Sequence, residues 1–227
     1  IGYRENDRFP VQSTFKLLAV SALLKQSVSN KNLLKKKIDY TKNDLVFWHP
    51  ITEKYVNSGM TLEALSAAAI SYSDNPAINL IMKKFGGIKF VTDFAEFIGN
   101  KSFHLSHFEP NLNSNPSLNE DISTPKDMAL SVQKILLSDL LPQTQRTKLV
   151  TWMRDNTTGD KRIRAGVPLG WSVADKTGSG EYGIANDIGV LTITNSTISG
   201  NSALYNGGGI FSSGLFLTIT NSTIAKN

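Results

Sequence analysis

The sequence contains no cysteine, only three histidines and no long apolar run. Without cysteine, the chain can form neither a disulfide framework nor a thiolate metal site. The histidines, His49, His104 and His107, lack the spacing of metal ligands, so we expect neither a metal nor another cofactor. No apolar segment reaches the roughly 20 residues that a membrane-spanning helix needs, so we expect no membrane span.

The net charge is +5 and the pI is about 9.3, so acidic partners have to be considered. Lys31 and the run Lys35–Lys37 lie close together, and such a cluster can bind nucleic acid. A solvated helix end is the commoner explanation of a lysine cluster, so we expect no nucleic-acid partner. The apolar fraction of 40% is sufficient for a core, and the length predicts one or two domains.

The composition changes near residue 190, because Lys226 is the only charged residue from there to the end. The segment Leu191–Ile198 recurs as Leu217–Ile224, at a period of 26 residues. Alternating Ile and Thr at a fixed period is typical of a β-solenoid, and it resembles the β-helix repeats of bacterial autotransporter and surface proteins. Because two repeats cannot bury a solenoid core, we expect a tail that is cut short or grafted. The predicted division is a domain of residues 1–190 and a repeat tail of residues 191–227.

Apolar periodicity, capping residues and glycine or proline breaks predict the secondary structure of the first part. Between residues 102 and 123 the chain is rich in Ser, Asn and Pro and has no periodicity, which predicts a long loop. Strands are expected over residues 170–180 and 187–193. Helices are expected over residues 12–28, 61–72, 77–84, 88–99, 124–137 and 142–156.

A hydroxyl and an amine lie three residues apart at the head of the first predicted helix, in Ser13 and Lys16. Positions i and i+3 of a helix share one face, so the two side chains point into the same space. A serine becomes a good nucleophile when a neighbouring base takes its proton, and a buried lysine can be that base. The pair therefore indicates an acyl-transfer site, although Ser-x-x-Lys alone also occurs in many ordinary helices.

Three later segments carry the other polar groups that an acyl-transfer site needs. Ser73-Asp74-Asn75 supplies a hydroxyl for proton relay and an amide that can hold a carbonyl group. Lys176-Thr177-Gly178 places a cation, a hydroxyl and an open backbone at a strand edge, where a bound amide can lie. Glu109 and Asn113 place a carboxylate and an amide in the long loop. Taken singly, such segments are more often a turn, a strand end or a solvated loop.

Taken together and in this order, the four motifs resemble those of class A serine β-lactamases, and penicillin-binding proteins share three of them. The resemblance covers residues from about 8 to 191. It implies an α+β fold, with a mostly helical domain beside an antiparallel sheet. It also implies hydrolysis of the β-lactam ring of penicillins and cephalosporins by a monomer, located in the periplasm or secreted from a bacterium.

The resemblance also assigns a role to each candidate residue. Ser13 corresponds to the acylated nucleophile, Lys16 to its helical partner, Ser73 to the relay hydroxyl and Glu109 to the residue that activates the deacylating water. Glu109 favours a hydrolase over a penicillin-binding protein, in which the acyl-enzyme persists. The residues implied in substrate binding are Trp48, Asn75, Asn113, Lys176, Thr177, Gly178 and Ser179.

The chain departs from the family pattern in several places. Compared with the family it is truncated at both ends, so we expect an incomplete sheet to which the repeat strands could be added. The arginine that binds the substrate carboxylate in some members is missing, which leaves Arg162 and Arg164 as alternatives. His107 stands where many members have an arginine, and we expect it to pair with Asp121. A different class of function also remains open, namely a surface β-helix protein that carries an inactive β-lactamase-like remnant.

Overall fold

Helix α1 (Phe15–Ser29) runs through the centre of the helical part and is buried on almost every side. Its sequence is apolar around most of the circumference, which predicts such a central position. It packs against four other helices, α2, α3, α4 and α6. The computed structural model describes residues 3–112, 119–181, 183–194, 197–199, 216–220 and 223–225.

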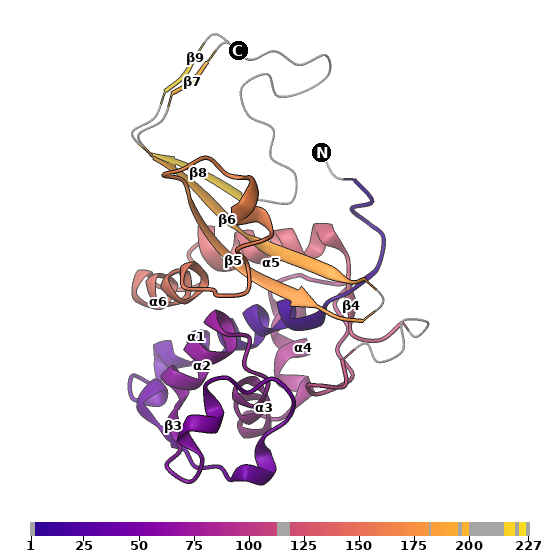
Figure 1. Cartoon of the computed structure of the whole chain (residues 1–227), viewed down its shortest axis with the longest axis vertical. Helices are drawn as coiled ribbons and strands as arrows, with labels where there is room; N and C mark the ends of the chain where they lie inside the picture. The colour runs from indigo at the N-terminus through magenta and orange to yellow at the C-terminus, as the bar shows by residue number, and fades with distance from the viewer. Residues whose placement is uncertain are drawn as a thin grey trace.

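All six predicted helices are present in the described part of the chain, and most of their ends differ by one or two residues from the prediction (Figure 1). The first differs most, because residues Gln12–Thr14 form a 3₁₀ turn and the α-helix begins only at Phe15. The remaining helices are α2 (Leu62–Ser71), α3 (Asn75–Lys84), α4 (Ile88–Phe97), α5 (Pro125–Leu137) and α6 (Gln143–Arg154). No described helix is long and apolar enough to cross a membrane.

Polar side chains fix the beginnings of three helices. Thr61 accepts a hydrogen bond from the backbone N–H of Ala64, and Thr124 accepts one from that of Asp127. Asp74 caps α3 in the same way, and Pro76 follows in its first turn. These contacts satisfy N–H groups that have no partner inside the helix. The two threonines lie at residues 61 and 124, where the sequence predicts that these helices begin.

The main sheet has the strand order β5–β6–β8, and in Figure 1 it lies above α1 and α2. Strands β5 (Ser172–Ser179) and β6 (Ala185–Thr194) form an antiparallel pair that contains both predicted strands. The β5–β6 pair is antiparallel, as expected, and strand β8 (Phe216–Thr220) of the repeat tail adds to β6 in parallel. The second repeat therefore adds to the first repeat and not to the strand that carries Lys176.

The pairing register of the tail matches the sequence repeat. Leu191 faces Leu217 and Ile193 faces Ile219, an offset of 26 residues. The same offset recurs where β7 (Thr197–Ser199) pairs in parallel with β9 (Thr223–Ala225). The two copies of the repeat thus stack in register over the described strands.

Two short antiparallel pairs anchor loops around the helices. Strand β1 (Phe9–Pro10) pairs with β4 (Ile122–Ser123), which joins the segment before α1 to the end of the long loop. Strand β2 (Lys37–Ile38) pairs with β3 (Met60–Thr61) just before α2. The first of these pairs thus connects the segment just before Ser13 with the end of the loop that carries Glu109.

Candidate active site

Ser13 lies in the 3₁₀ turn that precedes α1, at the point where this turn meets strand β5. A Cβ atom on Gly178 would lie 3.2 Å from the backbone nitrogen of Ser13 and 2.9 Å from Cβ of Gln12. Only glycine therefore allows the strand to come this close to the turn. Gln12 has a φ of 46°, so the chain bends sharply just before Ser13. The bend and the glycine together place the Ser13 hydroxyl at the edge of the strand.

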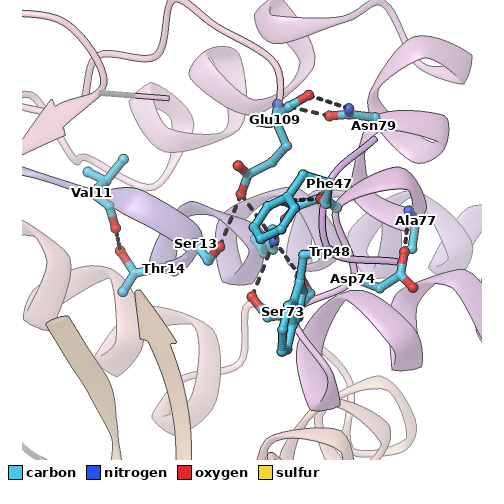
Figure 2. A network of polar contacts seen from close by, with 12 residues as sticks. Val11, Ser13, Thr14, Phe47, Trp48, Ser73, Asp74, Ala77, Asn79 and Glu109 are labelled. Carbon is cyan, nitrogen blue, oxygen red and sulfur yellow. Dashed lines mark hydrogen bonds and ion pairs between the residues drawn. The ribbon is translucent and has the colours of Figure 1, made fainter. Parts of the chain in front are cut away.

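The Ser13 hydroxyl donates a hydrogen bond of 3.0 Å to Oε1 of Glu109. The ammonium of Lys16 lies 3.0 Å from the same oxygen. Figure 2 shows the side chains of Ser13, Ser73 and Glu109 pointing toward a common centre. A carboxylate that accepts the proton of a serine hydroxyl is in position to act as a general base.

Lys16 is completely buried and is surrounded by oxygen atoms. Besides contacting Glu109, its ammonium donates to the backbone oxygen of Ser73 at 2.8 Å and to the side-chain oxygen of Asn75. Burial lowers the pKa of Lys16 below its usual range, and the charge of Glu109 opposes this shift. A lowered pKa makes the amine easier to deprotonate, so Lys16 can also take part in proton transfer.

Asn79 holds the backbone of Glu109 from both sides. Its side-chain nitrogen donates to the Glu109 carbonyl at 2.8 Å, and its side-chain oxygen accepts from the Glu109 N–H at 3.1 Å. This pair fixes the long loop to α3 exactly where the carboxylate enters the site. Sequence reasoning missed Asn79, because it lies inside a helix and its partner is 30 residues away.

Lys176 and Ser73 form a second polar contact on the side of strand β5. The buried ammonium of Lys176 donates to the Ser73 hydroxyl at 3.2 Å and to the backbone oxygen of Thr177 at 2.9 Å. Burial, followed by the nearby charge of Lys16, lowers the pKa of Lys176 to about 7. The Ser73 hydroxyl also lies 3.3 Å from the Lys16 ammonium, so it is within reach of both amines.

Asp74 organises the turn that carries Ser73 and Asn75. It is fully buried, and it accepts backbone hydrogen bonds from Ile51, Thr52 and Ala77 at 2.9–3.0 Å. The hydroxyl of Thr52 donates to the same carboxylate. Sequence reasoning noted Asp74 only as the middle residue of its motif, since these partners come from a separate loop.

A cleft of about 600 Å³ opens above the polar centre. Trp48 stands at its edge, where its indole N–H donates to the backbone oxygen of Tyr72 at 2.9 Å. The side-chain nitrogen of Asn75 donates to the backbone oxygen of Phe47. Of the predicted residues, the cleft is lined by Ser13, Trp48, Ser73, Asn75, Glu109, Thr177 and Ser179. Asn113 lies outside the described residues.

The two alternative arginines have different positions. Arg162 donates to the Ser179 hydroxyl at 2.7 Å and to the backbone oxygen of Asn186 at 3.1 Å, so it reaches the strand edge beside the cleft. Arg164 forms a buried ion pair with Asp175 at 2.7 Å and is turned away from the cleft. Of the two arginines, only Arg162 therefore contacts a residue of strand β5 that lines the cleft.

The predicted pairing of His107 with Asp121 is confirmed. Nδ1 of His107 lies 2.8 Å from a carboxylate oxygen of the fully buried Asp121. Asp121 also accepts the backbone N–H groups of Ser106 and His107, so it holds the start of the loop that carries Glu109. In the described part of the chain, no cluster of three or more His, Asp or Glu side chains could hold a metal ion.

Comparison with known proteins places this site in a family. The model of the β-lactamase enzyme family matches residues 1–201. β-Lactamase OXY-2 of Klebsiella oxytoca is 51% identical over 190 residues, which cover 83% of this chain and 66% of that protein. β-Lactamase CTX-M-97 of Escherichia coli is 48% identical, with coverage of 83% and 65%. The chain thus spans slightly less than two thirds of the length of these relatives.

Comparison with solved structures gives the same family. The crystal structure of a β-lactamase from Burkholderia phymatum is 47% identical, with a TM-score of 0.81 over 83% of this chain and 72% of that one. An ancestral class A β-lactamase gives the same TM-score at 45% identity and covers 83% of this chain and 73% of its own. The chain therefore belongs to the class A serine β-lactamase family.

Proposed function

We propose that the protein hydrolyses the β-lactam ring of penicillins and cephalosporins through an acyl-enzyme on Ser13, and so confers antibiotic resistance. The observation that carries this proposal is the meeting of Ser13, Lys16 and Glu109 at one carboxylate oxygen. A nucleophile and a buried amine that both contact a carboxylate base are the groups that acyl transfer to water requires.

In the first half-reaction, Oγ of Ser13 attacks the carbonyl carbon of the lactam. Its proton passes to Glu109, which accepts the hydrogen bond of the Ser13 hydroxyl, or to Lys16, which contacts the same carboxylate oxygen. The carbon–nitrogen bond breaks, and the ring nitrogen takes a proton through the hydroxyl of Ser73. The backbone N–H groups of Ser13 and Ser179 would stabilise the negative charge on the carbonyl oxygen.

In the second half-reaction, water hydrolyses the ester on Ser13. Glu109 takes a proton from this water, whose oxygen then attacks the ester carbon. The Ser13 oxygen recovers a proton and leaves, so the ring-opened acid is released and the enzyme is regenerated. Asn79 acts as a positioning residue, because it holds the backbone from which the Glu109 carboxylate extends.

We assign the carboxylate of the substrate to the edge of strand β5. Lys176, Thr177 and Ser179 line this edge, and Arg162 reaches it through its hydrogen bond to Ser179. A guanidinium can bind a carboxylate through two parallel hydrogen bonds, which suits Arg162 to this part of the site.

We predict that Arg162→Ala raises the KM for a cephalosporin about tenfold, which corresponds to about 1.4 kcal/mol of lost substrate binding. The kcat should change by less than about threefold, because the variant removes a contact made equally in the ground and transition states. Arg154→Ala, which removes an exposed arginine from α6, is the control and should leave KM unchanged. Equal KM values for Arg162→Ala and the parent protein would refute this assignment.

The tail favours a second function. The in-register stacking of its two repeats supports a β-solenoid segment of residues 191–227 beside a catalytic domain of residues 1–190. In that case the protein would be a bacterial surface β-helix protein that carries an inactive β-lactamase-like remnant. We otherwise propose a monomeric enzyme in the periplasm or outside the cell, with a small β-lactam as its partner.

The direct test of the proposed function is turnover of a chromogenic cephalosporin by the purified chain. The parent protein should open the ring catalytically, and Ser13→Ala should lower the rate by at least about 10³-fold, as removal of a nucleophile does in other serine enzymes. Turnover that is unaffected by Ser13→Ala, or no turnover by a folded parent protein, would contradict the proposal.

A further inference from the structure

A second group of ionisable side chains, of which one is buried and two are half-buried, lies on the face of strand β5 opposite to Lys176. It contains the carboxylates of Asp175 and Asp187 and the guanidinium of Arg164. The hydrolytic mechanism uses none of them. Asp175 immediately precedes Lys176 in the chain, so the charge of this group acts directly on the candidate substrate-binding cation.

The register of the sheet brings the two carboxylates together. Thr177 faces Asp187 and Asp175 faces Gly189 across the antiparallel pair of β5 and β6. Side chains two residues apart on a strand share a face, so Asp175 and Asp187 are diagonal neighbours on the same face of the sheet. Gly189 allows the two strands to approach closely at this point, since a Cβ atom there would lie 2.3 Å from the backbone oxygen of Ala174.

Asp175 already has its full set of donors. Arg164 donates to one of its oxygens at 2.7 Å, and the side chain of Asn156 donates to the other. The backbone of Gly159 closes over the second oxygen, where a Cβ atom would lie only 2.1 Å away. Asp175 is therefore held as a charged, buried carboxylate by the ion pair with Arg164.

Asp187 has fewer partners. Its Oδ2 accepts the backbone N–H of Ile163 at 3.2 Å, but its Oδ1 is buried and, among the described residues, no donor reaches it. The carboxyl groups of Asp187 and Asp175 are within hydrogen-bonding reach of each other. Two carboxylates in contact cannot both remain charged without a large cost, and a single proton between them removes the repulsion and satisfies the orphan oxygen.

We propose that Asp187 is a positioning residue that shares a proton with Asp175, and that release of this proton places an additional negative charge behind Lys176. The released charge favours the protonated form of Lys176. The buried pair thereby extends, toward alkaline pH, the range over which Lys176 can bind an anionic substrate. Only this last consequence rests on the proposed function, because the shared proton is a property of the folded chain.

The electrostatic environment of Asp187 favours the protonated form of its carboxyl group, as a proton shared with Asp175 requires. Burial, and then the charge of Asp175, raises the pKa of Asp187 from its ordinary 3.8 to about 6. The Ile163 N–H and the guanidinium of Arg162 face the same carboxyl and oppose the shift. On the other side of the strand, the charges of Asp175 and Asp187 both raise the pKa of Lys176, against the lowering by burial and Lys16.

The shared proton has a consequence for stability. Between pH of about 4 and 6, the folded state holds a proton on Asp187 that the unfolded chain has released. The contribution of this proton to folding stability is fully present below pH of about 4. It is lost as the pH rises from about 4 to about 6. In the Asp187→Asn variant, the asparagine side chain cannot ionise, but its amide group can still donate a hydrogen bond to Asp175. The melting temperature of this variant relative to the parent should therefore increase as pH rises from 4.5 to 7.5.

Asp139→Asn provides the matched control, because it removes an exposed carboxylate from the chain by the same substitution. Its difference from the parent should be the same at every pH. A second measurement needs no variant: the carboxyl carbon of Asp187, followed by NMR, should titrate with a midpoint near pH 6. A midpoint near pH 4, or an Asp187→Asn effect that is constant with pH, would overturn the shared proton.

The effect on Lys176 has its own test. In Asp187→Asn, the alkaline limb of the pH profile of kcat/KM should move toward acid by about half a unit, about threefold in rate on the limb. An unchanged limb, together with the pH-dependent melting difference, would refute the coupling to Lys176 while leaving the shared proton in place. Melting and NMR do not depend on turnover, so failure of the proposed function itself would be recognised separately.

Discussion

Glu109→Gln is expected to convert the protein from a hydrolase into a binder that stays acylated on Ser13. The amide has the same shape as the carboxylate, but it cannot accept a proton from water. Removal of a general base typically costs about 10²–10⁴ in rate, so we expect kcat to fall about 10³-fold. Acylation should be less affected if Lys16 can act as the base, so the acyl-enzyme should accumulate.

The appropriate measurement is intact-protein mass spectrometry within seconds to hours of mixing with a cephalosporin. Glu109→Gln should carry about one adduct per chain for minutes or longer. Glu96→Gln, which neutralises an exposed carboxylate on α4, is the control and should turn over like the parent protein. Rapid, complete hydrolysis by Glu109→Gln would exclude Glu109 as the residue that activates water.

Asp74→Asn is expected to cause the largest loss of stability among substitutions around the site. One carboxylate oxygen of Asp74 accepts the N–H groups of Ile51 and Thr52, and the other accepts that of Ala77. In either orientation of an asparagine, its NH₂ group would face at least one of these donors in a fully buried space. We expect a loss of about 3 kcal/mol in the free energy of unfolding.

For a chain of this size, 3 kcal/mol corresponds to a decrease of roughly 9 °C in melting temperature. Asp44→Asn is the matched control, since Asp44 also caps a helical turn but is partly exposed. It should lose about 1 kcal/mol or less. If the two variants melt at the same temperature, the buried network around Asp74 does not have the stabilising role described here.

Much of the fold follows from local features of the sequence. The continuous apolar surface of residues 15–24 predicts a central helix, and α1 is buried along that stretch. Thr61 and Thr124 predict helix starts because capping is decided within three residues. The period of 26 residues likewise predicts that the two repeats stack on each other. It does not predict that the second repeat pairs with β6 and not with β5.

The residues that sequence reasoning missed act over long separations. Asn79 contacts Glu109 across 30 residues, and Asp74 contacts Thr52 across 22. Neither contact leaves a local pattern, since an asparagine inside a helix looks like any exposed polar residue. The choice between Arg162 and Arg164 had the same difficulty. We favour Arg162 because Arg164 forms an ion pair with the buried carboxylate of Asp175.

The most direct test of hydrolysis through Ser13 is the time course of the mass of the purified chain after mixing with a chromogenic cephalosporin, with Ser13→Ala in parallel. If Ser13 is acylated and Glu109 activates water, an adduct forms on the parent protein and disappears as the colour develops, and no adduct forms on Ser13→Ala. An adduct that forms on Ser13 and persists would indicate a penicillin-binding activity, in which Glu109 does not activate water. The absence of both adduct and turnover in a folded parent protein would contradict hydrolysis through Ser13 and would favour an inactive β-lactamase-like remnant.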